Sequence, residues 1–144
     1  MRAVLRTFAG LAAAFGIVGS ASAATCHVTP QAISFGIVDP IGGAAVDGVG
    51  SVNVTCDAPV DFAVGLSAGT GTFDDRRMSS GAAQLRYNIY TNPSRSIIWA
   101  DGIAGSSVSG SGTNVDLTMY GQITAGQNAR AGSYVDSVVV TISY

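Results

Sequence analysis

The chain has 144 residues, of which 47% are hydrophobic and only 11% are charged, and its net charge is −2. All nine acidic residues are Asp, and the sequence contains neither Lys nor Glu. A nucleic-acid-binding protein needs a clustered basic surface, which this composition excludes, and the apolar content is too high for a disordered chain. Low charge with abundant Gly, Ser, Thr and Val is typical of an extracellular β protein.

Residues 1–23 are expected to form a signal peptide that is cleaved. Arg2 and Arg6 accompany a short apolar stretch, and Ala21 and Ala23 supply the small side chains that a signal peptidase accepts. The apolar stretch is shorter than the roughly 20 residues that a membrane-spanning helix needs. The sequence therefore predicts export, one mature domain over residues 24–144, and no membrane span after cleavage.

The two cysteines of the chain, Cys26 and Cys56, both lie in the mature domain and are predicted to form a structural disulfide. An exported pair of cysteines is normally oxidised. Closing the loop between Cys26 and Cys56 should stabilise the fold by roughly 3.5–4 kcal/mol. A metal or redox pair is the alternative. It is disfavoured because the sequence has no CxxC motif and only His27 could assist.

Short alternating segments separated by Gly-rich turns predict a β-sandwich of six to seven strands. The predicted strands are residues 26–38, 49–57, 60–68, 85–91, 96–99, 115–123 and 132–144. Pro30 suits an edge strand or a switch between sheets, and Ala58-Pro59 is expected to form a turn between two strands. The Gly/Ser-rich residues 104–113 are expected to be a flexible loop.

The final predicted strand has the clearest pattern. Val138, Val140, Ile142 and Tyr144 share one face, and the intervening residues share the other. Because most domains end in a few polar residues, an apolar strand at this position is expected to need pairing along its edges and cover on one face. If this chain has no strand left to cover the terminal strand, another chain is the alternative source of the covering strand.

No residue set predicts catalysis, a cofactor site or a metal site. His27 is the only histidine, and the sequence assembles neither a Ser/His/Asp triad nor a metal-ligand set around it. The segment Asp74-Asp75-Arg76-Arg77 lacks the alternating ligands of a calcium loop, so we expect a solvated loop with local ion pairs. A hydrolase is therefore disfavoured, since nucleophile, base and orienting group are all missing.

Two aromatic residues are expected to have structural roles. Trp99 could form an exposed contact, but packing over the sandwich core is favoured. Tyr134 precedes the last predicted strand, which suits the structural role of a tyrosine corner.

A succession of short motifs spans the mature chain. The motifs are Cys26-x-Val28, Ser34-Phe35-Gly36, Val52-x-Val54-x-Cys56, Arg77-Met78, Leu85-x-Tyr87-x-Ile89-Tyr90, Trp99-x-Asp101-Gly102, Tyr120-Gly121-x-Ile123 and Gly132-Ser133-Tyr134-x-Asp136-x-Val138. Each motif alone is unspecific. Together, and in this order, they resemble the spore coat protein U domain family, which includes the subunits of archaic (Csu-type) chaperone–usher pili.

The resemblance implies an all-β, immunoglobulin-like sandwich that lacks its final strand. A periplasmic chaperone supplies that strand first and a neighbouring pilus subunit supplies it in the fibre, by strand addition to an open edge. The implied acceptor strand carries Val138, Val140, Ile142 and Tyr144, expected to face Val28, Ile33 and Phe35 across a groove. The implied partners are the chaperone, the outer-membrane usher and neighbouring subunits, and the implied location is the periplasm in transit and then the cell surface.

Fibre-forming members of the family carry a donor extension before the first cysteine. Cleavage after Ala23 would leave only Ala24 and Thr25 there, and a strand needs about five residues at about 3.3 Å each. The expectation is a subunit or accessory that accepts a strand but does not donate one. The alternative is a self-sufficient extracellular coat or adhesion module, closed by its own residues 26–38, that does not polymerise.

Overall fold

Residues 23–144 are described by the computed structural model, and the predicted signal peptide lies outside them apart from Ala23. This part of the chain contains six strands and no helix. The strands are β1 (Cys26–Ser34), β2 (Val46–Leu66), β3 (Arg76–Ser80), β4 (Ala83–Tyr90), β5 (Val108–Ile123) and β6 (Val140–Ser143). Among the described residues, no helix is long and apolar enough to cross a membrane.

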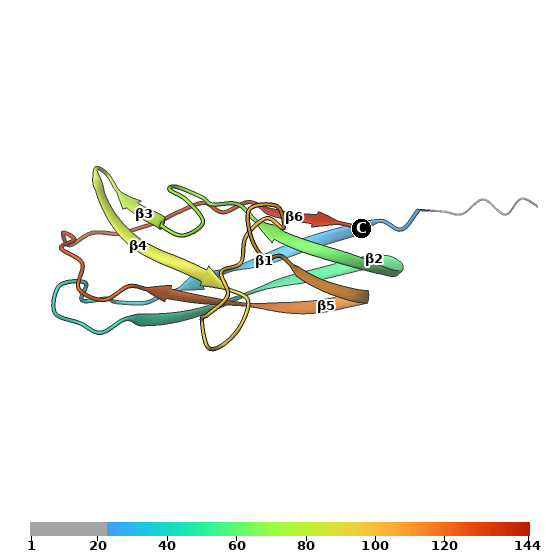
Figure 1. Cartoon of the computed structure of the whole chain (residues 1–144), viewed down its shortest axis with the longest axis horizontal. Helices are drawn as coiled ribbons and strands as arrows, with labels where there is room; N and C mark the ends of the chain where they lie inside the picture. The colour runs from blue at the N-terminus through green and yellow to red at the C-terminus, as the bar shows by residue number, and fades with distance from the viewer. Residues whose placement is uncertain (1–22) are drawn as a thin grey trace, which may run out of the picture.

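A long antiparallel ribbon of β2 and β5 forms the centre of the fold. Residues 46–55 pair with residues 114–123, the register then shifts, and residues 60–64 pair with residues 108–112. Figure 1 shows that the ribbon bends at this shift and doubles back on itself. One pair of strands thus contributes to both layers of an immunoglobulin-like β-sandwich, the fold class that the sequence predicted.

The remaining strands are added to the edges of this ribbon. The strand order is β1-β2-β5-β4-β3, and β6 also pairs with β2. β1 pairs with residues 49–56, in the first half of β2, whereas β6 pairs with residues 63–66, in the second half of β2. β1 and β6 therefore lie along the same edge of β2, one beside each half.

The predicted disulfide between Cys26 and Cys56 is confirmed, and it joins two residues that are register partners in β1 and β2. β1 continues through Pro30, which is paired with Val52, and an irregularity follows between Gln31 and the end of the strand. The disulfide thus fixes the first strand to the ribbon at the end where the ribbon bends.

The core consists of the side chains that alternate inward along the strands. The most buried members include Val52, Val54, Cys56, Phe62, Val64, Leu66, Leu85, Tyr87 and Ile89. Trp99 is fully buried, as predicted, and its Nε1–H donates a 2.8 Å hydrogen bond to the Val64 carbonyl. The period-2 pattern of the sequence therefore identified the inward faces of these strands.

Two predicted boundaries in the ribbon are wrong. The strand does not end at Ala58-Pro59: both residues belong to β2 and lie within its register shift, where the ribbon bends. The strand predicted over residues 115–123 begins earlier, at Val108, and includes residues 108–113 of the Gly/Ser-rich stretch that was expected to be a flexible loop. The small residues there serve packing: a Cβ on Gly110 would lie 2.7 Å from the Phe62 ring.

The C-terminal strand is shorter than predicted. β6 covers only Val140–Ser143, so Val138 lies ahead of it. An isolated antiparallel bridge joins Val135 to Ser79 of β3. Residues 132–139 are therefore tied to neighbouring strands at individual points instead of forming a continuous ladder.

Candidate functional site

β1 and β6 each have one edge without a strand partner. β1 pairs with β2 alone, and β6 pairs with β2 alone, among the residues that the structure describes. Figure 1 shows that β1 starts beside the end of β6 and runs in the opposite direction. A strand laid between them would be antiparallel to one and parallel to the other.

An apolar groove with a volume of about 470 Å³ lies between β1 and residues 134–140. Its floor consists of core side chains, namely Leu66, Met78, Tyr87, Ile89 and Met119. Ile33 and Phe35 line it from the β1 side, and Val138 and Val140 line it from the C-terminal side. Each of these floor side chains is at most 8% exposed, so the groove lies directly above the hydrophobic core.

Glycines in β2 and β5 allow the β1 side of the groove to lie close to the sheet. A Cβ on Gly48 or Gly121 would lie 2.8 Å from atoms of both Ile33 and Phe35. The Phe35 ring also meets the Tyr87 ring edge-on, with their centroids 6.2 Å apart. These contacts fix the positions of Ile33, in β1, and Phe35, just after it, which both line the groove.

The C-terminal side of the groove is attached to the loop after β2 and to β3. The main-chain groups of Val135 and Ser79 exchange hydrogen bonds of 2.8 and 3.1 Å. Ser67 donates its N–H to the Val139 carbonyl, and its Oγ accepts the Val139 N–H, each at 2.9 Å. Because main-chain groups alternate in direction along a strand, those of Val140 point away from β2, toward the open edge.

Asp136 joins this C-terminal side to the floor. Its carboxylate accepts a 2.7 Å hydrogen bond from the Tyr87 hydroxyl and a 3.0 Å bond from the Thr70 N–H. Gly69 has a φ of +62°, and a Cβ there would collide with the Asp136 carboxylate. Burial, followed by the hydrogen bond to Asp136, raises the pKa of Tyr87 well above its ordinary range, so the hydroxyl stays protonated and keeps donating.

Arg76 is fully buried, which corrects the prediction of a solvated loop at this position. Its Nε–H and Nη2–H groups donate to the Ser67 carbonyl, at 3.2 and 2.8 Å, and Nη2 also donates to the Trp99 carbonyl at 2.8 Å. Nη1 donates to the Asn88 side chain at 2.7 Å. Burial lowers the pKa of Arg76, and carbonyl oxygens satisfy the cation without a directly bonded carboxylate.

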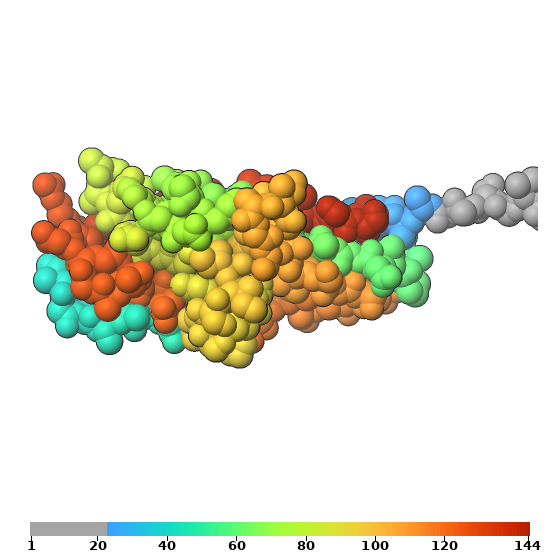
Figure 2. All heavy atoms as spheres, in the orientation of Figure 1, coloured from blue at the N-terminus to red at the C-terminus, as the bar shows by residue number. Residues whose placement is uncertain are grey.

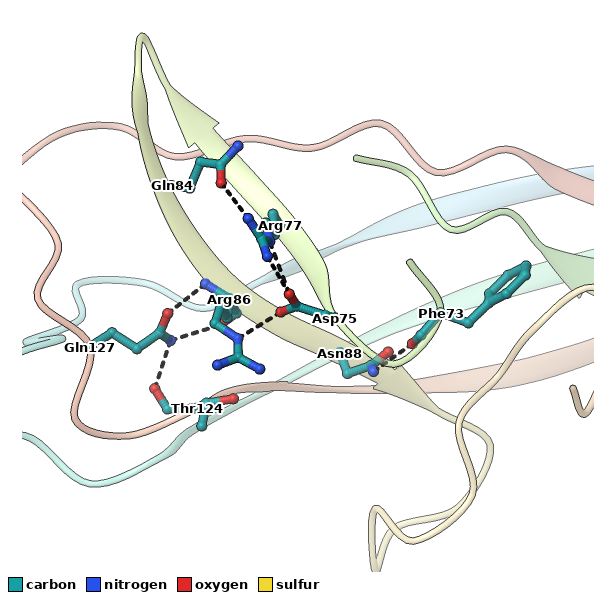
Figure 3. A network of polar contacts seen from close by, with 8 residues as sticks. All are labelled: Phe73, Asp75, Arg77, Gln84, Arg86, Asn88, Thr124 and Gln127. Carbon is teal, nitrogen blue, oxygen red and sulfur yellow. Dashed lines mark hydrogen bonds and ion pairs between the residues drawn. The ribbon is translucent and has the colours of Figure 1, made fainter. Parts of the chain in front are cut away.

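The neighbouring charges form the local ion pairs that the sequence predicted. Asp75 accepts hydrogen bonds from Arg77 and Arg86 on the outer side of β3 and β4, as Figure 3 shows. Hydrogen bonds from these two guanidinium groups hold the pKa of Asp75 below its usual value. The Gln127 side chain bonds both the N–H and the carbonyl of Arg86 and so continues the pairing of β4 beyond β5.

The predicted site residues are only partly brought together. Val138 and Val140 line the groove with Ile33 and Phe35, whereas Val28, Ile142 and Tyr144 do not. Ile142 is paired with Val64 in β6, and Figure 2 shows the start of β1 next to the end of the chain at one end of the molecule. The groove is therefore open beside the second half of β1 and closes toward this end.

The other singled-out residues have structural surroundings. His27 is exposed on β1 opposite Thr55, and the described residues contain no cluster of His, Cys, Asp or Glu that could hold a metal ion. The Tyr134 hydroxyl donates a 2.8 Å hydrogen bond to the Arg130 carbonyl, which is the contact of a tyrosine corner. Sequence reasoning missed the part that Arg76 and Asp136 play at the groove. The position of Arg76, two residues before the buried Met78, was the available signal.

Comparison with known proteins agrees with the fold and the motifs. A chain in the crystal structure of the CsuC–CsuE chaperone–tip adhesion subunit pre-assembly complex, from archaic chaperone–usher Csu pili of Acinetobacter baumannii, is 24% identical. It matches with a TM-score of 0.61 over 85% of this chain and 40% of that one, so the present chain spans less than half of that protein. Protein U of Myxococcus xanthus is 32% identical over 127 residues, which cover 78% of this chain and 71% of Protein U.

The model of the Spore Coat Protein U domain matches residues 12–141. This match spans most of the chain, including every strand up to the last residues of β6. The chain therefore belongs to the Spore Coat Protein U domain family.

Proposed function

We propose that this protein is an exported structural subunit or accessory of an archaic chaperone–usher pilus, and that its groove accepts a β-strand from another chain. The observation that carries the proposal is an apolar groove between the second half of β1 and residues 134–140, with the free edge of β1 on one side and the free edge that β6 begins at Val140 on the other. An added strand would satisfy both edges with main-chain hydrogen bonds, while its alternate side chains would enter the groove.

Physical chemistry favours a strand over a small ligand as the occupant. Core side chains such as Met78 and Met119 form the floor of the groove, and the outward-pointing main-chain groups of Val140 in β6 border it. A small apolar ligand could cover the side chains but would leave those main-chain groups unpaired. A strand covers both.

The partners follow from the relatives. The solved complex of a tip adhesion subunit with its chaperone supports a periplasmic chaperone as the first donor of a strand. The outer-membrane usher and neighbouring pilus subunits are the further partners of this proposal, and the route is export to the periplasm and then to the cell surface. The proposed role is structural and involves no catalysis.

The proposal includes a direction of use. Cleavage after Ala23 leaves Ala24 and Thr25 ahead of β1, and Thr25 is already hydrogen-bonded to Asp57. A mature chain of this kind accepts a strand and donates none. N-terminal sequencing of the exported protein tests this directly: a longer segment before Cys26 would contradict it.

The groove is tested by adding a strand to the purified domain. The probe is a synthetic peptide of about ten residues that alternates Val or Ile with Ser or Thr, long enough to span a strand of ordinary length. We expect it to raise the melting temperature and to reduce self-association of the domain, and a control peptide with Asp at the apolar positions should do neither. A monomeric domain whose melting temperature both peptides leave unchanged would show that the groove accepts no strand.

A second candidate is a self-sufficient extracellular coat or adhesion module that does not polymerise. The match to the Spore Coat Protein U domain supports a coat protein as this second candidate. This hypothesis expects residues 26–38 to close the sandwich, whereas β1 makes its ladder with β2 and leaves the gap beside β6. Usher and chaperone genes next to the gene for this protein would favour the pilus subunit, and their absence would favour the module.

A further inference from the structure

We infer that Tyr87, Asp136 and Ser67 hold the C-terminal side of the groove in its receiving position before any strand binds. This inference rests on the proposed function, because it concerns how the same groove is kept open. It assigns the three residues a positioning role in strand acceptance.

The hydrogen bonds that tie residues 135–139 to the rest of the fold go to β3, to the loop after β2 and to the floor of the groove. Val135 bonds to Ser79 of β3, Asp136 bonds to Thr70 and Tyr87, and Val139 bonds to Ser67. Three of these partners belong to β3 or to the loop that follows β2, and the fourth, Tyr87, is a floor residue. The segment is therefore held without any contribution from an added strand.

Arg76 fixes the loop to which the segment is attached. The buried guanidinium binds the Ser67 carbonyl through two N–H groups, and Ser67 in turn bonds both the N–H and the carbonyl of Val139. Two further bonds tie the same guanidinium to the Trp99 carbonyl and to Asn88. A fully buried cation thus anchors the residue that anchors the groove.

Asp136 supplies the second attachment. The carboxylate reaches Tyr87 because Gly69 has no side chain to obstruct it. Tyr87 contributes its ring to the floor, against Phe35, and its hydroxyl to Asp136. One residue therefore links the floor, the β1 side and the C-terminal side.

The consequence is preorganisation. A segment that is already ordered loses less conformational freedom when a strand binds, so binding is tighter than to a mobile segment with the same side chains. Loosening the attachment should weaken strand binding more than it weakens the fold as a whole.

The test compares Tyr87→Phe with Tyr120→Phe in the full mature domain. Tyr87→Phe keeps the ring in the floor and removes only the bond to Asp136. Tyr120→Phe makes the same change next to Met119 in β5, where the alternation of the strand places the side chain on the opposite face. The two readouts are amide hydrogen exchange of the free protein and the dissociation constant of the alternating Val/Ser peptide.

We expect Tyr87→Phe to speed amide exchange in residues 135–139 by about tenfold and to weaken peptide binding by about fivefold to tenfold, the size expected for one hydrogen bond. Exchange at the core residues Val52 and Val54 should stay unchanged, and Tyr120→Phe should match wild type in both readouts. Ser67→Ala, which removes the Oγ acceptor of the Val139 N–H, should act in the same direction. It replaces Tyr87→Phe in the test if that variant folds poorly.

The outcomes separate this inference from the proposed function. If wild type binds the peptide and both variants bind it equally well, or if exchange in residues 135–139 is unchanged, the positioning role is wrong and the proposed function stands. If wild type binds no peptide, the proposed function fails. The exchange data would then still report whether these residues hold the segment, but a role in strand acceptance would be overturned.

Discussion

Gly48 of β2 and Gly121 of β5 are register partners, and the Phe35 ring occupies the space that their missing side chains leave. This relationship brings the end of β1 onto the sheet and makes one side of the groove. It also explains why two glycines, which are unfavourable inside strands, occur directly opposite each other in the central ribbon.

Gly121→Ala is expected to displace Phe35 and Ile33 from the groove. The added Cβ would lie 2.8 Å from atoms of both side chains, and overpacking of this kind typically costs about 1–3 kcal/mol. Urea denaturation measures the change. The control is Gly42→Ala, where the nearest atom, an Asp39 oxygen, would lie at 3.6 Å and the expected change is within about 0.5 kcal/mol. Equal stability of the two variants would contradict the packing described for Phe35.

The disulfide between Cys26 and Cys56 is expected to contribute strongly to stability, because it ties β1 to the ribbon beside a groove that lacks a strand. Removing a native disulfide from a small exported domain typically costs about 2–5 kcal/mol. Denaturation with and without a reducing agent measures this loss. The double variant Cys26→Ala/Cys56→Ala should be as unstable as the reduced protein and should not respond to reductant. A wild type that keeps its unfolding midpoint when fully reduced would contradict the prediction.

Asp75 should make stability depend on acidic pH. Its pKa is lowered in the folded protein, first by hydrogen bonds from Arg77 and then from Arg86, so the unfolded chain binds the proton more readily. This contribution is present above about pH 4, the ordinary range of an Asp carboxyl, and is lost as the pH falls through the lowered pKa.

The measurement is the melting temperature between about pH 2 and pH 7 for wild type and Asp75→Asn. The variant should be less stable near neutral pH and should lose stability less steeply on acidification. Because all three side chains are partly exposed, the difference should shrink at high salt. Parallel pH profiles would show that the ion pairs do not contribute.

Much of the fold could be predicted because inward-facing residues alternate with polar ones. The pattern at Val52 and Val54 and again at Phe62 and Val64 gave the correct buried faces. It could not show that both segments form one strand, because continuity depends on the partner strand. That partner, residues 108–112, is Gly/Ser-rich, because the Phe62 ring leaves no room for a side chain at Gly110.

The candidate site was predictable to a similar degree. Val138 and Val140 follow from the alternation of the terminal segment and do line the groove. The place of Arg76 did not follow, because charge suggested exposure and the carbonyls that bind it come from distant residues, Ser67 and Trp99. Asp136 was part of a recognised motif, but only the tertiary structure places it against Tyr87.

The central claim is that one strand is missing between β1 and β6, and amide hydrogen exchange with and without the alternating Val/Ser peptide tests it most directly. The account predicts that the peptide slows exchange at alternate residues in the second half of β1 and in residues 134–140, the two sides of the groove. Exchange that is unchanged at both edges, or slowed only along residues 108–119 of β5, would contradict it.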